Sequence, residues 1–310
     1  MKWEVAVAET NETGESPFWH PQEQRLYWVD IPAMRVHRWE PASGNRETWQ
    51  LAQEPGCIAP AVGGGLVLAL RDGIYRARTW AGPLEPIVRF QHGKTTRFND
   101  GKADPLGRFW AGTYYEPKDA RKADLYALDC RPDNGERGKP IVQLKAGNAT
   151  SANGLAWSPD QRTLYWSDTA RHAIYAWDWE PRANVMRHHR VFRQFAGKPA
   201  GWNPGAPGYG GRPDGAAVDE EGCYWVAMYE GGRLLRLAPD GATAAEFEVP
   251  ARCPTMPCFG GPDGRTLYLT SARQGRPADE LAAYPHSGCV FAARVDVAGL
   301  PTNFFIPSPQ

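Results

Sequence analysis

The sequence lacks several features that would place it in large classes of protein. It contains no C-x-x-C pair, no H-E-x-x-H motif and no paired Cys/His spacing, which argues against a zinc finger. No apolar run is long enough to cross a membrane as a helix. Its 35 Lys and Arg residues balance its 35 Asp and Glu residues, so no net charge attracts it to nucleic acid or to an acidic membrane surface. We therefore expect neither nucleic acid nor a membrane as a partner.

An export signal and a disulfide framework are missing as well. The N-terminal sequence MKWEVAVAETNETGE has too short an apolar stretch for a secretory signal. The six cysteines show no dense spacing and are interpreted as free thiols of a reducing compartment: Cys57, Cys130, Cys223, Cys253, Cys258 and Cys289. These observations predict a cytoplasmic protein.

Helical periodicity is scarce, and a repeated β-hairpin pattern takes its place. Glycine (33) and proline (28) are frequent, and short β-branched or aromatic runs alternate with turn signals. Each repeat reads as a short strand, a tight turn and an aromatic-rich strand, which is a hairpin. The units are ESPFWHPQEQRLYWVDI from Glu15, a less regular copy from Cys57, NDGKADPLGRFWAGT from Asn99, NGLAWSPDQRTLYWSDT from Asn153, DGAAVDEEGCYWVAMY from Asp214 and CFGGPDGRTLYLTSA from Cys258.

The spacing of these repeats predicts the fold. One apolar residue anchors each second strand and recurs about every 40 to 60 residues, which is typical of propeller blades with four strands: Trp28, Leu68, Trp110, Trp166, Trp225 and Leu269. We therefore predict an all-β protein, a six-bladed β-propeller that forms a single domain over residues 1–310. Residues 3–9 have no nearby partner, so we expect this strand to close the ring beside residues 288–297. The absence of a G-H…W-D pairing argues against a WD40-type interaction propeller.

Polar residues occupy one equivalent position in four of the repeats. They precede the anchor residue and are Glu15, Asn99, Asn153 and Asp214. Because the first strand of each blade lines the central channel, these side chains should converge at one end of the axis. Buried carboxylates and amides are costly unless they are paired or bound to a cation, and oxygen donors suit hard divalent ions. Asn-Gly and Asp-Gly are also ordinary turn formers, but four of these residues in register favour a site.

Several segments resemble one family. GESPFW, RFNDGKADPLGRFWAGT, NGLAWSPD and GRPDGAAVDEEGCYWVA are similar to signature segments of the senescence marker protein/gluconolactonase/regucalcin family. The resemblance implies a six-bladed propeller that opens sugar lactones with one divalent metal ion, for which Ca²⁺, Zn²⁺, Mn²⁺ and Fe²⁺ are candidates. By residue, it implies that Glu15, Asn153 and Asp214 are the metal ligands, and that Arg97 and Asn99 bind the substrate.

Two further segments are expected near the pocket. Residues 113–124, TYYEPKDARKAD, lie where the family has a flexible segment, so Tyr115 and Glu116 are candidate substrate contacts. Residues 193–213 form a long Gly-, Pro- and aromatic-rich insert that should overhang the pocket. Its Trp202 and Tyr209 are candidates for stacking on a sugar face.

We expect other residues of the channel to serve packing, turn formation or catalysis. Cys57 and Cys258 would be small buried packing residues, and Asp100 and Lys102 a local pair that stabilises a turn. The chain has no G-x-S-x-G motif, so a serine-hydrolase route has no support. Asp214 is the candidate catalytic base for the attacking water. Arg97 and Asn99 would orient the sugar and stabilise developing negative charge.

Other functions on the same scaffold stay open. A phosphotriester or aryl-ester hydrolase, a non-catalytic calcium-binding protein and a quinone-dependent sugar dehydrogenase are the alternatives. Arg97 and Asn99 beside the metal position argue against a simple calcium buffer, and the missing export signal argues against the dehydrogenase. The candidate substrates are aldonolactones such as glucono-, xylono- or arabinonolactone. The oligomeric state is left open.

Overall fold

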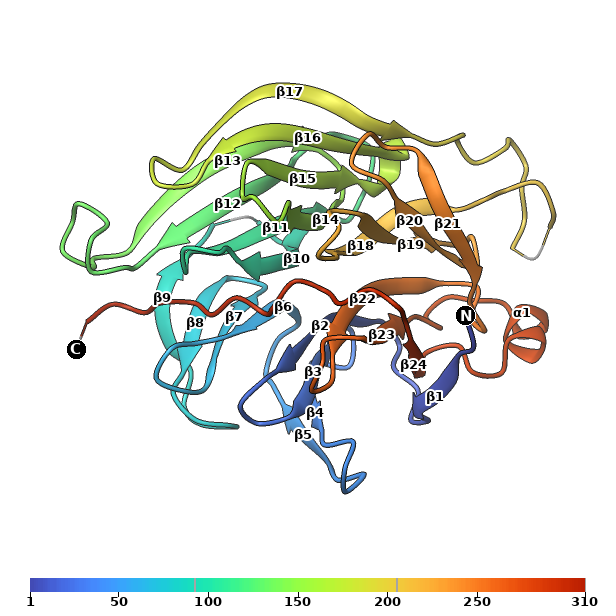
Figure 1. The fold of residues 1–310 in the computed structure, drawn as a ribbon, viewed down its shortest axis with the longest axis horizontal. Helices are drawn as coiled ribbons and strands as arrows, with labels where there is room; N and C mark the ends of the chain where they lie inside the picture. Colours follow the sequence, from blue (N-terminus) through green and yellow to red (C-terminus); the bar gives the residue numbers. More distant parts are fainter. Residues whose placement is uncertain (92, 205, 310) are drawn as a thin grey trace.

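The computed structural model describes residues 1–91, 93–204 and 206–309, and its strands are arranged radially around a hub (Figure 1). Within these residues the strands form six four-stranded antiparallel sheets. The first strands of successive blades contact one another around the hub, from β2 through β6, β10, β14, β18 and β22 back to β2. The prediction of an all-β six-bladed propeller is therefore confirmed.

Five blades are formed by consecutive strands. Blade 1 contains β2 (Gly14–His20), β3 (Arg25–Asp30), β4 (Arg35–Trp39) and β5 (Arg46–Gln50). Blade 2 contains β6 (Pro55–Pro60), β7 (Leu66–Leu70), β8 (Gly73–Ala77) and β9 (Glu85–Arg89). Blade 3 contains β10 (Thr96–Ala103), β11 (Phe109–Tyr115), β12 (Ala123–Asp129) and β13 (Ile141–Ala149). Blade 4 contains β14 (Ala152–Trp157), β15 (Thr163–Asp168), β16 (Ala173–Glu180) and β17 (Val185–Gln194). Blade 5 contains β18 (Arg212–Val218), β19 (Tyr224–Tyr229), β20 (Arg233–Leu237) and β21 (Thr243–Glu248).

The last blade combines both ends of the sequence. It contains β22 (Pro254–Gly260), β23 (Thr266–Ser271), β24 (Val290–Arg294) and the N-terminal β1 (Glu4–Val7), which pairs with β24. This pairing confirms the predicted closure of the ring. Two short helices, η1 (Thr169–Arg171) and α1 (Ala278–Ala283), lie between strands. Neither is long and apolar enough to cross a membrane, and the rest of the described chain contains no helix that is.

The aromatic anchors are fixed by the turns that precede them. In blade 3, Oδ1 of Asp104 accepts the backbone N–H groups of the turn, while Oδ2 accepts Nε1–H of Trp110 at 2.9 Å. In blade 5, Asp219 does the same for its own turn and accepts Nε1–H of Trp225 at 2.8 Å. Each aspartate thus closes a tight turn and satisfies a buried indole N–H group. These tryptophans belong to the core between blades, as predicted.

A segment that the sequence analysis did not predict crosses the hub. Residues 299–309, here called the C-terminal strap, run across the centre of the ring in Figure 1. The Leu300 N–H donates to Val218 O at 3.0 Å, and Phe305 forms a parallel bridge with Ala61. The Phe305 side chain is fully buried. The strap therefore ties several blades together.

The cysteines lie in the interior of the protein. All six are free and buried. Cys57 packs in the core between blades 2 and 3, and Cys258 packs in the core between blades 1 and 6, so both are packing residues.

Candidate active site

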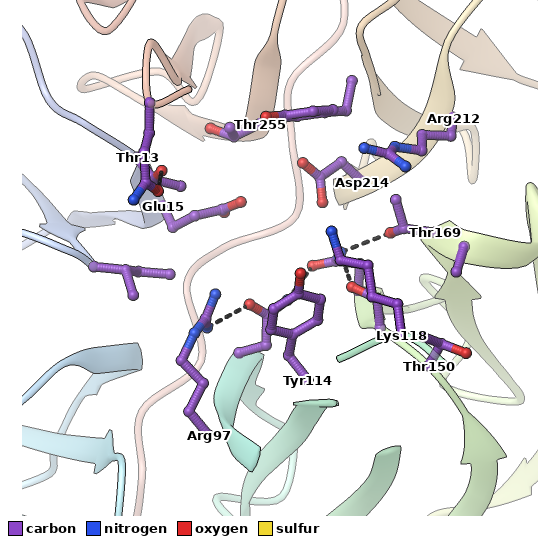
Figure 2. A pocket seen from close by; sticks show the side chains of 17 residues that line it. Thr13, Glu15, Arg97, Tyr114, Lys118, Thr150, Thr169, Arg212, Asp214 and Thr255 are labelled. Carbon is purple, nitrogen blue, oxygen red and sulfur yellow. Dashed lines mark hydrogen bonds between the residues drawn. The ribbon is translucent and has the colours of Figure 1, made fainter. Parts of the chain in front are cut away.

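A β-bulge interrupts the first strand of each blade at the same level. In the four polar repeats, the register with the second strand shifts between Glu15 and Phe18, Phe98 and Gly101, Asn153 and Ala156, and Pro213 and Ala216. A bulge bends its strand and changes the direction of the side chains beside it. Four side chains at these bulges line one cavity of about 240 Å³ (Figure 2): Glu15, Asn99, Asn153 and Asp214.

Arg97 lines the same cavity, so the structure brings together five of the six predicted site residues. Glu116 does not line the cavity. Its carboxylate forms an ion pair with Arg71 at 2.8 Å, and its Oε1 lies 3.9 Å from Nε of Arg97. From the same segment, Tyr114 lines the cavity, whereas Tyr115 is buried on the other face of β11, as strand alternation requires.

The carboxylates of the hub destabilise one another's charge. Burial raises the pKa of Glu15 well above its ordinary value, and the charges of Asp214 and Asp100 raise it further. Burial also raises the pKa of Asp214 to about 8, against the opposing effect of Arg212. Buried carboxylates that repel each other create a strong preference for a cation between them.

A hydrogen-bonded chain of amides fixes the third candidate ligand. Nδ2 of Asn153 donates to Thr169 Oγ1 at 2.7 Å, while Oδ1 of Asn153 accepts from Nδ2 of Asn99 at 2.9 Å. Asn99 accepts in turn from Nη1 of Arg97 at 2.8 Å. These partners define which end of each amide is oxygen. Oδ1 of Asn153 keeps a second lone pair for a ligand. Within the described part of the chain, the side-chain hydrogen bonds of Arg97 use Nη1, so Nη2 is left for a ligand.

The donor set suits one hard divalent ion. In the described part of the chain, no three His, Cys, Asp or Glu side chains cluster as a metal site. The candidate set consists instead of two carboxylates and one amide, from Glu15, Asp214 and Asn153. Oxygen donors of this kind suit Ca²⁺, Mg²⁺ or Mn²⁺, and a divalent cation would offset the repulsion between the two carboxylates. These residues therefore fit the metal ion that the sequence predicts.

The Asn-Gly pair of blade 4 requires its glycine for two reasons. Gly154 has a φ of +61°, a backbone conformation that other residues rarely adopt. A Cβ at this position would lie only 2.2 Å from the hydroxyl of Tyr224, which donates to Gly154 O. Because the glycine has no side chain, blades 4 and 5 can pack closely next to the candidate ligand Asn153.

Asp100 and Lys102 do not form the local turn pair that the sequence suggested. Both lie within β10 of blade 3; Asp100 reaches the neighbouring blade 4, and Lys102 reaches blade 5. Oδ2 of Asp100 accepts the backbone N–H of Leu155 at 3.0 Å, and Nζ of Lys102 donates to Ala216 O. The bulge turns these side chains into the hub, so they join blades instead of stabilising a turn.

The described residues of the insert at 193–213 contact one another and residues outside the insert. The Trp202 and Tyr209 rings meet edge to face at 5.0 Å, and Tyr209 shares a 2.7 Å hydrogen bond with Nε2 of His172. Neither ring lines the cavity. The insert contributes Arg212 at its C-terminal end instead.

Sequence reasoning missed several residues that line the cavity. The charged ones are Lys118, from the loop after β11, and Arg212, at the start of β18. Hydroxyl groups and rings complete the lining, among them Tyr114, Thr150, Thr169 and Tyr229. Arg212 stands only two positions before Asp214 in the segment GRPDG, so its position in the sequence was the available signal.

Known proteins resemble the chain over nearly its whole length. Residues 13–273 match the model of the SMP-30/gluconolactonase/LRE-like region. Over 300 residues the chain is 43% identical to a 6-deoxy-6-sulfogluconolactonase from Pseudomonas putida, covering 96% of this chain and 97% of that protein. It is 32% identical over 303 residues to regucalcin from Danio rerio, with 97% of each covered. Among solved structures, a calcium-binding regucalcin from Agrobacterium tumefaciens matches with a TM-score of 0.86 and 25% identity, over 97% of this chain and 96% of that one.

Proposed function

The chain belongs to the SMP-30/gluconolactonase/LRE-like family and is a sugar lactonase, and we propose that it hydrolyses an aldonolactone to the aldonic acid with one divalent metal ion held in the hub cavity. Glu15, Asn153 and Asp214 are the proposed ligands. The observation that carries the proposal is the convergence of two mutually repelling buried carboxyl groups and an oriented amide oxygen in one cavity.

The chemistry follows from the needs of a cyclic ester. Hydrolysis requires an electrophilic carbonyl, an activated water and a group that stabilises the oxyanion. When bound, the ion supplies a Lewis acid for the carbonyl and a water of lowered pKa. A carboxylate oxygen of Asp214 accepts the proton of the attacking water. The same proton passes to the ring oxygen as the bond between that oxygen and the carbonyl carbon breaks, which opens the ring to the aldonic acid.

Arg97 provides a positive charge that faces the lactone ring. Its Nη1 is committed to Phe98 O and Asn99 Oδ1, which holds the guanidinium in one orientation. Nη2 then donates to the lactone oxygens as negative charge develops on them. Both N–H groups of Asn99 are committed, to Ala152 O and Asn153 Oδ1, so Asn99 acts mainly by positioning Arg97 and Asn153.

We propose a six-carbon lactone of the gluconolactone type, because a relative with 43% identity is a 6-deoxy-6-sulfogluconolactonase. Calcium is the proposed ion, because the oxygen-only donor set suits it and a structural relative is described as calcium-binding. Zn²⁺, Mn²⁺ and Fe²⁺ are the ions to compare with it.

A lactone panel tests the proposal. Chelator-treated protein receives each ion in turn, and acid release is followed on gluconolactones and on xylono- and arabinonolactone. Paraoxon and an aryl ester are included as competing substrates. We expect lactone hydrolysis that disappears on chelation and returns with the ion. Faster turnover of the phosphotriester or aryl ester, or no turnover with any ion, would contradict the proposal.

A further inference from the structure

The charges that line the cavity are unbalanced in favour of cations. The ionisable acids among the lining residues are Glu15 and Asp214, and the bases are Arg97, Lys118 and Arg212. On the proposed function, on which this inference rests, a divalent ion offsets both carboxylates. The three basic side chains then face a substrate, and a neutral lactone offers them no counter-charge.

Arg212 is held firmly but is only partly neutralised. Its Nη2 lies 3.3 Å from Oε2 of Glu230, a carboxylate that also binds Lys198 at 2.6 Å and Arg276 at 3.0 Å. Glu280 pairs with Arg276 at 2.7 Å, so three cations share two carboxylates. Nε of Arg212 is buried and has no hydrogen-bond partner among the described residues. A buried donor of this kind needs an acceptor, which a water molecule or a bound ligand can supply.

The backbone just before Arg212 is closely packed against a second segment. Gly211 has a φ of +85°, and a Cβ there would lie 2.6 Å from the backbone nitrogen of Gly231. The guanidinium of Arg212 rests over the ring of Tyr229, 5.2 Å from its centroid. The close approach of these two glycine-containing segments thus sets the position from which Arg212 enters the cavity.

Lys118 supplies a second cation at the cavity. It lies in the loop between β11 and β12, and it forms no ion pair within the described chain. Its Nζ lies 5.4 Å from the ring centroid of Tyr114. In Figure 2, Lys118 and Arg212 are on one side of the cavity together with the hydroxyl groups of Thr150 and Thr169, and Arg97 is on the other side.

We propose that Arg212 and Lys118 form an anion-binding subsite that selects a lactone carrying a negatively charged group on the carbon chain away from the lactone carbonyl. Such a group accepts charge-assisted hydrogen bonds from both cations, and the guanidinium can bind two of its oxygens at once. A sulfonate, a phosphate ester and a carboxylate share this chemistry. Arg97, on the other side of the cavity, then binds the lactone ring.

The test compares kcat/KM for charged and neutral lactones of the same carbon skeleton. The calcium-loaded protein receives 6-deoxy-6-sulfogluconolactone, 6-phosphogluconolactone, glucarolactone and glucono-δ-lactone. At least one charged substrate should exceed the neutral one by about 100-fold, as expected for two hydrogen bonds to a charged group. Raising the salt concentration should lower kcat/KM for the charged lactone more than for the neutral one. The preferred substrate identifies the anionic group.

Substitutions locate the subsite. Arg212→Gln and Lys118→Gln should each lower the charged-to-neutral ratio of kcat/KM about tenfold, chiefly through KM. Lys122→Gln is the matched control: it removes the same charge from the same loop, but its Nζ lies over Tyr115 and outside the cavity lining. The ratio should not change in this control. The chelator-treated protein should also bind the sulfonated aldonic acid more weakly after Lys118→Gln.

The outcomes separate this inference from the proposed function. Hydrolysis of the neutral lactone with no preference for any charged one would overturn the subsite and leave the lactonase proposal standing. A wild-type ratio in either folded variant would overturn it as well. If Arg212→Gln does not fold, the subsite is tested by the charged-to-neutral ratio of Lys118→Gln and by the salt dependence of the wild type. Failure to hydrolyse any lactone would overturn both proposals.

Discussion

Nδ2 of Asn99 donates a 2.9 Å hydrogen bond to Oδ1 of Asn153 across the boundary between blades 3 and 4. Each residue lies at the bulge of its own first strand. The bond connects Arg97, which would contact the substrate, to Asn153, which would contact the metal ion. The two functions of the cavity are therefore coupled through one amide.

Asn99→Ala should weaken both functions together. Without Asn99, Oδ1 of Asn153 loses its donor and Arg97 loses the acceptor that orients its Nη1. Loss of such a supporting bond typically costs about 10- to 100-fold in metal affinity or activity. Calorimetric metal titration and kcat/KM on the best lactone measure the two effects. Asn303→Ala serves as the control, because Asn303 donates to Ala103 O at the other end of β10. An Asn99→Ala variant with wild-type metal affinity would contradict the coupling.

Arg97→Ala should separate substrate turnover from metal binding. The guanidinium is not among the proposed ligands and reaches Asn153 only through Asn99, so the metal affinity should change much less than the rate. The rate should fall by about 100-fold or more, as is usual when a donor to a developing oxyanion is removed. Steady-state kinetics and metal titration of the same preparation measure both quantities. Unchanged kinetics on every active lactone would remove Arg97 from the site.

His37 should give the fold a specific sensitivity to acid. Its ring stacks on Trp28 at 5.0 Å, and its Nδ1 forms a 2.9 Å hydrogen bond with Oγ1 of Thr48. Burial lowers its pKa to about 4. Between about pH 6.5 and pH 4, the unfolded chain binds a proton there that the folded protein does not, so stability falls as the pH falls.

The size of this effect can be isolated by substitution. A shift of this size corresponds to about 3 kcal/mol of unfolding free energy, lost between pH 6.5 and pH 4. Urea unfolding over this pH range should show a shallower loss for His37→Gln than for the wild type. Equal pH dependence in the two proteins would show that His37 does not titrate as described.

Phe305→Ala should destabilise the ring without affecting the chemistry. The Phe305 side chain is fully buried against Phe109 of blade 3, and its backbone pairs with blade 2. Its truncation should cost about 3–5 kcal/mol. Phe304→Ala is the matched control, because Phe304 is only partly buried and should cost less than half as much. Denaturant unfolding measures the loss, and lactonase activity of the folded fraction should stay at the wild-type level. If Phe305→Ala lowers the unfolding free energy by less than about 1 kcal/mol, the strap does not hold the blades together.

The blade pattern could be predicted because its signals are local. A turn aspartate and an aromatic anchor lie within one hairpin, as in Asp219 and Trp225, so a short stretch of sequence contains the whole unit. The convergence of Glu15, Asn153 and Asp214 could also be predicted, because the radial symmetry of a propeller converts equivalent positions into neighbours.

The features that were missed depend on contacts between distant segments. Arg212 enters the cavity because Glu230 and the glycine segments hold it, and no local pattern encodes this arrangement. Phe305 lies in a stretch with no repeat to compare it with. The Asp100–Lys102 interpretation was wrong because the bulge, which the sequence pattern does not reveal, turns both side chains toward other blades.

The measurement that tests the central claim most directly is a calorimetric titration of chelator-treated protein with Ca²⁺, for the wild type, Glu15→Gln and Asp214→Asn. The wild type should bind one ion per chain at the hub. Each variant should lose most of its calcium affinity together with its lactonase activity, because each keeps one charged carboxylate where the proposed site has two. Binding of one ion with unchanged affinity in both variants would contradict the assignment of the hub carboxylates as metal ligands.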